Sequence, residues 1–340
     1  MTPTAVENEP TTSFRERFRD FQYVAQELCL LERYNRAALA DHREGELRLH
    51  SFLALTLLAL ERFLRMVLGA NATDSDTLPN LLEMATGGRN KVFELSDREK
   101  TLRFVNETRR VVMHGKLGVT DEAEHLLGYL LPLSFDLYEF TNQVVACWEP
   151  LSGAARPGAR VSFTPRHLAP DGPKVVLTPI EELISLNRHN KTYGPHDPQD
   201  GLLMFAEGAL CMTLIEAAAR RWVGDGVLPA DAKFRPVLKA AAASGLRIPF
   251  DDADDGITKL CAVKNTLVHG NFEQAARGAG GRDVATYFKE QYAGEIERMY
   301  RVCLHFLTQV QERDGQTKQA SDGYVRTGPS KKTRGGRKKK

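Results

Sequence analysis

The chain has 340 residues, a length that suggests two domains, each large enough to bury its own core without disulfides or metals. Hydrophobic residues make up 42% and charged residues 26%, and the net charge is only +2, as is ordinary for a globular protein. No apolar run approaches the ~18 residues that a membrane-spanning helix needs, and the N-terminus lacks the features of a signal peptide. We therefore expect a cytoplasmic protein without a membrane partner.

The spacing of apolar residues at i, i+3, i+4 and i+7 predicts helices along nearly the whole chain, whereas alternating strand patterns are scarce. The fold class expected is therefore all-α. A first set of helices is predicted over 14–40, 47–68, 79–86, 97–114 and 121–148. A second set is predicted over 179–190, 199–223, 230–244, 255–269 and 283–312. Residues 149–177 are rich in Pro, Gly and Ala and predict a linker, with a short extended piece at 161–163.

The two sets of helices resemble each other at an offset of 155 residues. QELCLLERYN (26–35) aligns with EELISLNRHN (181–190) with five identities, which include Glu27/Glu182 and Asn35/Asn190. Two further blocks share this offset, so we predict an internal duplication of one helical domain. The predicted organisation is a disordered N-terminus (1–13), a first domain (14–148), a linker (149–177), a second domain (178–313) and a disordered tail (314–340).

The charge is concentrated at the C-terminal end. Residues 314–340 contain nine basic and two acidic residues, a local net charge of +7, so the rest of the chain carries −5. A segment of this composition cannot bury enough apolar surface to fold, and its expected partner is a polyanion such as RNA. The alternative is a tail that only increases solubility. The basic side chains at its end are Lys331, Lys332, Arg334, Arg337, Lys338, Lys339 and Lys340.

Cysteine usage indicates reduced thiols. None of the five cysteines forms a CxxC pair, and an odd number scattered over apolar stretches predicts free core residues in a cytosolic protein. Closely spaced zinc ligands are absent, as are the phosphate-binding GxxxxGK[ST] loop, HExxH and GxSxG. The sequence therefore predicts neither a metal nor a cofactor.

A polar set repeats within the apolar helices of both copies. Glu61 and Arg65 are separated by four positions, as are Glu216 and Arg220, so each pair can form an ion pair on one helical face. Such a pair is an ordinary surface feature when it occurs alone. In both copies, however, a His directly before a helix-ending Gly also follows a basic residue by five positions. These residues are Arg109 with His114 and Lys264 with His269.

Together these residues resemble the HEPN domains (higher eukaryotes and prokaryotes nucleotide-binding). The family marks are Arg, four to six residues, then His, together with Glu-x3-Lys/Arg on an earlier helix. Both marks occur in both copies, so the resemblance covers roughly 14–148 and 178–313. The chain departs from the pattern at Arg110, where a polar residue such as Asn is usual. It departs again at Lys264, which precedes the expected Asn265 but lacks the planar fork of Arg.

The resemblance implies a metal-independent endoribonuclease in which two HEPN units bring their His-bearing helices to one cleft. The two copies of this chain could form that pair internally or in a homodimer. RNA is the implied partner, and a defence or stress role with an antitoxin-like or defence-system partner protein is expected. The alternative is a non-catalytic scaffold that binds RNA or protein through a degenerate HEPN site, which Lys264 and Arg110 would favour.

The chemistry is physically reasonable without the family. Cleavage of RNA by its own 2′-hydroxyl needs a base, an acid and positive charge at the phosphate, and His suits the first two tasks. We expect His114 and His269 to divide them, Arg109 and Lys264 to hold the phosphate, and Arg110 and Asn265 to share the face of their His. In the alternative, each His only caps the last carbonyls of its helix.

Overall fold

The computed structural model describes residues 14–43, 46–73, 76–87, 91–113, 123–149, 154–156, 158–165, 180–193, 203–224, 227–229, 232–268 and 293–326. These residues form ten α-helices and four two-residue strands, so the all-α fold class is confirmed. The first half contributes α1 (Phe14–Ala40), α2 (Leu49–Leu68), α3 (Leu78–Thr86), α4 (Arg98–Met113) and α5 (Ala123–Ala146). The second half contributes α6 (Ile180–Tyr193), α7 (Met204–Val223), α8 (Phe234–Ala243), α9 (Ala253–Leu267) and α12 (Ala293–Arg326).

The segment between the halves contains most of the strand structure. β1 (Glu94–Leu95) pairs in parallel with β4 (Arg160–Val161), and β2 (Trp148–Glu149) pairs antiparallel with β3 (Ala154–Ala155). The extended piece predicted at 161–163 is thus a strand at 160–161. The pairing of β1 with β4 ties this part of the linker to the first half.

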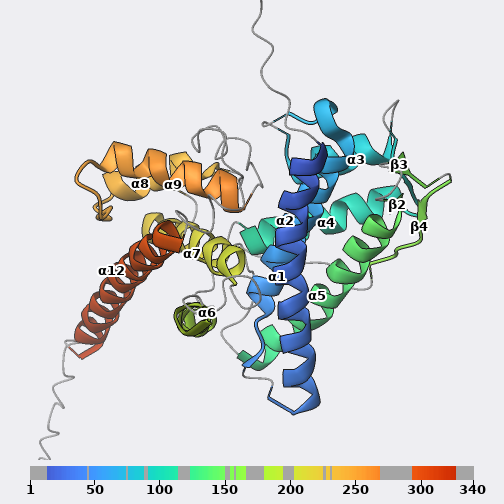
Figure 1. Cartoon of the computed structure of the whole chain (residues 1–340). Helices are drawn as coiled ribbons and strands as arrows, with labels where there is room; N and C mark the ends of the chain where they lie inside the picture. Colours follow the sequence, from blue (N-terminus) through green and yellow to red (C-terminus); the bar gives the residue numbers. More distant parts are fainter. Residues whose placement is uncertain are drawn as a thin grey trace, which may run out of the picture.

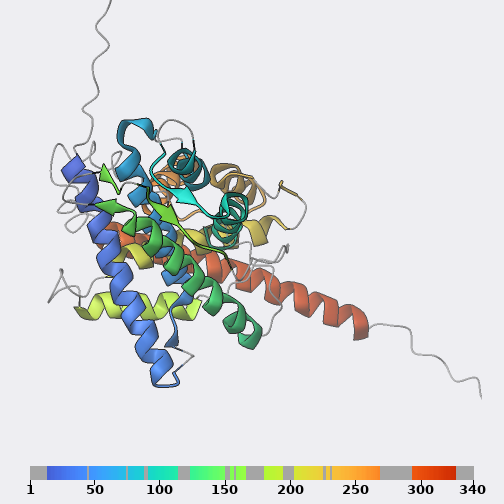
Figure 2. The same cartoon turned by 90° about the vertical axis from the view of Figure 1, so that its right-hand side faces the viewer.

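The C-terminal helix differs from its predicted bounds. Helix α12 continues to Arg326, although the sequence predicted a helix ending at 312 and a tail from 314. Figure 2 shows this helix extending away from the body of the molecule. The hydrogen bonds of a helix are local, so a helix can extend beyond the body of a protein. Residues 327–340 lie outside the described residues.

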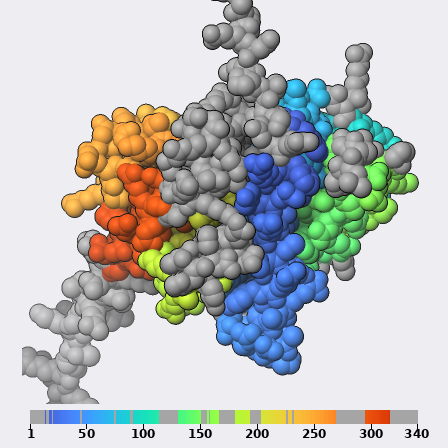
Figure 3. Space-filling view, in the orientation of Figure 1, coloured from blue at the N-terminus to red at the C-terminus, as the bar shows by residue number. Residues whose placement is uncertain are grey.

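The two halves share one core, with α2 and α7 at its centre. Helix α2 packs against α1, α5 and α7, while α7 packs against α6, α8, α9 and α12 (Figure 1). Apart from Met204 and Ala217, the buried apolar residues of both helices belong to a single cluster. On the surface drawn in Figure 3 the first half, in blue to green, lies beside the second half, in yellow-green to red. The halves are therefore joined through their central helices.

The bounds of two pairs of helices follow the offset seen in the sequence. Moving α2 by 155 residues gives 204–223, which are the bounds of α7, and moving α4 gives 253–268, against 253–267 for α9. The ends of the central helices match as well. Gly69 and Gly224 both adopt positive φ (55° and 90°), and their N–H groups donate to the carbonyls of Arg65 and Arg220. The duplication of the whole domain stays a prediction, since α5 moved by 155 residues gives 278–301, whereas α12 covers Ala293–Arg326.

The starts of the central helices share an unusual cap. Asn35 Oδ1 accepts from the N–H of Arg48 at 2.9 Å, and Asn190 Oδ1 accepts from the N–H of Leu203 at 2.8 Å. Each Asn also donates through Nδ2 to the carbonyl of that same residue. Neither Arg48 nor Leu203 makes a side-chain cap of its own. The asparagines shared at the 155-residue offset therefore anchor the two central helices.

We expect Asn35→Ala and Asn190→Ala each to lower the free energy of unfolding by about 1–2 kcal/mol, because each removes a bidentate helix cap. Urea unfolding measures both values. Asn190→Ala should lose at least as much as Asn35→Ala, because Asn190 Nδ2 also donates to the Glu207 carboxylate at 2.6 Å. A loss at only one position would contradict the equivalence of the two caps.

The cysteines are free, as predicted, but their burial varies. Cys147, Cys211 and Cys303 are buried, while Cys29 is exposed. The expectation of a core position is therefore wrong for Cys29, which lies on the outer face of α1. Within the described part of the chain, none of the helices has the length and apolar character needed to cross a membrane.

Candidate functional site

The repeated Glu-x3-Arg pairs are buried ion pairs rather than surface features. Nη2 of Arg65 donates to Oε1 of Glu61 at 3.2 Å. Oε1 of Glu216 accepts from Nε and Nη2 of Arg220 at 2.9 and 2.7 Å. Both carboxylates are inaccessible, with 1% and 0% exposure for Glu61 and Glu216. A buried carboxylate needs such partners, because leaving it unpaired in the interior is costly.

Each of these arginines also fastens the segment that leads into the next short helix. Arg65 donates to the carbonyls of Thr73 (2.9 Å) and Asp76 (2.6 Å), just before α3. Arg220 donates to the carbonyl of Ala232 at 2.6 Å, just before α8. The two motifs therefore perform the same structural task in the two halves.

Lys264 completes the buried cluster of the second half. Its ammonium group forms an ion pair with Glu216 and lies 4.5 Å from the ring centre of Phe234. Burial lowers the pKa of Lys264, against the opposing effect of the Glu216 carboxylate. At 2% exposure this side chain is directed into the protein.

Arg109 occupies the equivalent place in the first half. It is 9% exposed, and its charge, like that of Arg65, favours the ionised form of Glu61. Burial nevertheless dominates and raises the pKa of Glu61 to about 7. In both halves the base that precedes the His by five residues is thus buried near the Glu of the Glu-x3-Arg pair.

The helix ends that lead to the two histidines meet at the junction of the halves. Lys264 Nζ lies 3.5 Å from the carbonyl oxygen of Met113, the last residue of α4. The positive charge of Arg109 also lowers the pKa of Lys264, which places both bases in one electrostatic cluster. The structure therefore brings together Glu61, Arg65, Arg109, Glu216, Arg220 and Lys264.

The residues that follow the two bases face outward. Arg110 and Asn265 are both exposed, whereas Arg109 and Lys264 are buried. This split is expected on a helix, where neighbouring residues point about 100° apart. His114, His269 and the basic tail residues Lys331, Lys332, Arg334, Arg337, Lys338, Lys339 and Lys340 lie outside the described residues.

Two glutamates that sequence reasoning had not assigned a role link the halves reciprocally. Glu27 on α1 accepts from the N–H groups of Phe205 and Ala206, at the start of α7 in the other half. Glu182 on α6 accepts from the N–H groups of His50 and Ser51, at the start of α2. The identity of Glu27 and Glu182 at the 155-residue offset was the available signal. Such reciprocal contacts are typical of a two-fold interface between two copies.

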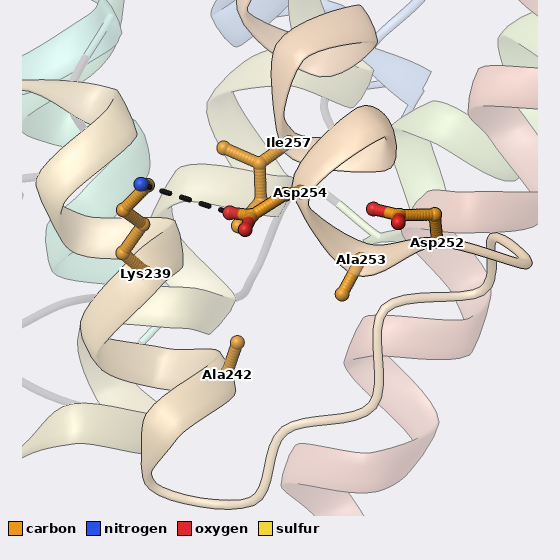
Figure 4. Close-up of a pocket in the computed structure, with 6 residues that line it drawn as sticks. All are labelled: Lys239, Ala242, Asp252, Ala253, Asp254 and Ile257. Atoms are coloured by element: carbon orange, nitrogen blue, oxygen red, sulfur yellow. Dashed lines mark ion pairs between the residues drawn. The ribbon is translucent and has the colours of Figure 1, made fainter.

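A surface groove between α8 and α9 contains none of the predicted site residues. It is lined by Ala242, Ala253 and Ile257, with Asp252 and a Lys239–Asp254 ion pair of 3.6 Å (Figure 4). Lys264 lies ten residues after Asp254 on α9, about 15 Å away along the helix. Among the residues that the structure describes, no group of three His, Cys, Asp or Glu is arranged to hold a metal ion.

Comparisons with protein-family models, with curated proteins and with solved structures gave no match for this chain.

Proposed function

We propose that the chain is a metal-independent endoribonuclease of HEPN type whose two half-sites are contributed by its two halves. The observation that carries this proposal is the contact between Lys264 Nζ and the carbonyl of Met113. Met113 directly precedes His114, and α9 ends two residues before His269. The two helices that precede the histidines in the sequence are thus joined at one junction, within one chain.

The buried positions suggest a division of roles that differs from the sequence expectation. Because Arg109 and Lys264 lie inside the protein, we assign them to holding the ends of α4 and α9 in place. Arg110 and Asn265, which are exposed on the same helices, are better placed to contact the RNA phosphate. The guanidinium group of Arg110 is planar and can donate two parallel hydrogen bonds to a phosphate. The first half would thus supply most of the positive charge, and the second half the neutral amide of Asn265.

In the proposed reaction one His removes the proton from a ribose 2′-hydroxyl, and the freed oxygen attacks the adjacent phosphorus. The bond from phosphorus to the 5′-oxygen breaks, and the other His protonates that oxygen. The products are a 2′,3′-cyclic phosphate and a 5′-hydroxyl end. No metal is required, because the proton transfers and the charge on the phosphate are handled by side chains.

Purified protein incubated with mixed RNA should produce 2′,3′-cyclic phosphate ends at the same rate with and without EDTA. The His114→Ala/His269→Ala variant should cleave at least about 100-fold more slowly, because a general acid or base typically contributes 10²–10⁴ in rate. Electrophoresis and end-group analysis measure both. A requirement for added Mg²⁺ or Mn²⁺ would overturn the His-based mechanism.

A specific observation supports a second candidate, a scaffold that binds RNA or a partner protein without cutting. Both bases of the motif are occupied inside the protein, Lys264 by Glu216 and Arg109 near Glu61. For this candidate the same experiment should show RNA binding without cleavage in both the unmodified chain and the double His variant. A defence role with an antitoxin-like or defence-system partner belongs to either candidate.

A further inference from the structure

The two central helices begin in the same way but are surrounded by different side chains. Arg48, His50 and Ser51 at the start of α2 correspond, at the 155-residue offset, to Leu203, Phe205 and Ala206 at the start of α7. Both starts have the same Asn anchor and the same Glu cap from the other half. The apolar set at α7 shows that this local structure does not need a polar set.

The polar set at α2 is buried and only partly satisfied. Arg48, His50 and Ser51 are 5%, 8% and 0% exposed. Within the described part of the chain, Nε and Nη1 of Arg48, Nε2 of His50 and Oγ of Ser51 have no hydrogen-bonding partner. Buried polar groups are rarely left unpaired, since each costs about 1–3 kcal/mol.

Two of these side chains contact neighbouring residues of α6 through their remaining nitrogens. Arg48 Nη2 lies 3.4 Å from Oγ of Ser185, and His50 Nδ1 lies 3.3 Å from a carboxylate oxygen of Glu182. Glu182 and Ser185 are three residues apart, about 4.5 Å along the helix. The guanidinium group of Arg48 also lies over the ring of Tyr34, at 3.9 Å from its centre, which fixes its plane.

We propose that this cluster, formed by Arg48, His50 and Ser51 beside α6, binds a phosphate group. Its unpartnered atoms include two N–H donors on a buried guanidinium, the side chain that best recognises phosphate. The backbone N–H groups at the start of α2 already donate to Asn35 and Glu182, so the binding would rest on the side-chain donors. The site lies at the opposite end of α2 from Glu61, about 17 Å away along the helix, and is distinct from the proposed RNA-cleaving residues.

Thermal unfolding of the full chain in phosphate tests this proposal without reference to activity. We expect 10 mM phosphate to raise the Tm by about 2–4 °C relative to NaCl of equal ionic strength, because a ligand that binds the folded state stabilises it. A 5′-mononucleotide forms a second arm. A shift at lower concentration of the nucleotide than of phosphate would support the site and identify a nucleotide phosphate as its source.

The start of α7 in the second half shows which substitutions to test. Arg48→Leu and His50→Phe introduce the residues found at the equivalent positions at the start of α7, so both are expected to fold. Arg48→Leu should abolish the phosphate shift and weaken binding measured by calorimetry at least tenfold, because a charge-assisted contact is lost. His50→Phe should reduce the shift. Lys259→Leu, which removes an exposed cation on α9, is the matched control and should keep it.

Two results would overturn the proposal. One is an unmodified chain that responds to phosphate no more than to NaCl, which would mean that the free donors bind only water. The other is an equal phosphate response in Arg48→Leu and in the unmodified chain, which would place the binding elsewhere.

Discussion

The Glu216→Gln variant is expected to lose about 3–5 kcal/mol of unfolding free energy, the cost of leaving buried charge without its counter-charge. Glu216 is fully buried, forms an ion pair with Lys264 and accepts two hydrogen bonds from Arg220. Replacing the carboxylate by a neutral amide leaves two cations in the interior, with Arg109 near them. Urea unfolding followed by circular dichroism measures the loss.

The equivalent change in the first half is the matched control. Burial raises the pKa of Glu61 to about 7, so this carboxyl group loses its charge more readily near neutral pH than an ordinary glutamate does. Glu61→Gln should therefore cost less than Glu216→Gln at pH 7. Equal losses would show that the two carboxyl groups carry the same charge.

The double variant Glu216→Gln/Lys264→Met distinguishes the loss of the buried ion pair from the loss of side-chain packing around it. Methionine keeps an unbranched apolar side chain beside Phe234 and removes the ammonium group. We expect the double variant to recover part of the stability lost in Glu216→Gln, because a buried ion pair can often be replaced by apolar groups at little cost. A double variant less stable than Glu216→Gln would contradict this.

The helices could be predicted because their signals are local. Apolar periodicity placed the helix over 14–40 at the observed bounds of α1, and predicted 47–68 against 49–68 for α2. The largest miss is the C-terminal helix, which runs to Arg326 instead of 312. Periodicity reports an apolar face, and the sequence over 314–326 is too polar to show one.

The candidate site was predictable only in part. The offset of 155 residues identified Glu61, Arg109, Glu216 and Lys264 as a repeated set, and the structure brings these residues together. Their burial was not predicted, because a base on a helix can face either solvent or the neighbouring helix, and the sequence does not say which. The exchange of Glu27 and Glu182 between the halves is a tertiary contact across 178 and 131 residues, for which no local pattern exists.

The stability of the chain should fall as the pH rises toward 8, because of Glu27. Burial raises the pKa of this carboxyl group from 4.5 to about 8, and the backbone N–H groups of Phe205 and Ala206 only partly oppose this. Between pH 4.5 and about pH 8, Glu27 keeps its proton in the folded state and has lost it in the unfolded state. The stabilisation from the neutral form is therefore complete below pH 4.5 and is lost progressively up to about pH 8, at about 1.4 kcal/mol per pH unit.

Glu27→Gln should remove this pH dependence, because glutamine keeps an acceptor oxygen for the start of α7 and does not titrate. The pKa of Glu61 is raised to about 7, so this group also lowers the free energy of unfolding as the pH rises, but mainly below pH 7. The range from pH 7 to 8 therefore reports best on Glu27. Urea unfolding at half-unit steps compares the two slopes. If Glu27→Gln retains the full slope between pH 7 and 8, the proton taken up on folding resides on another group.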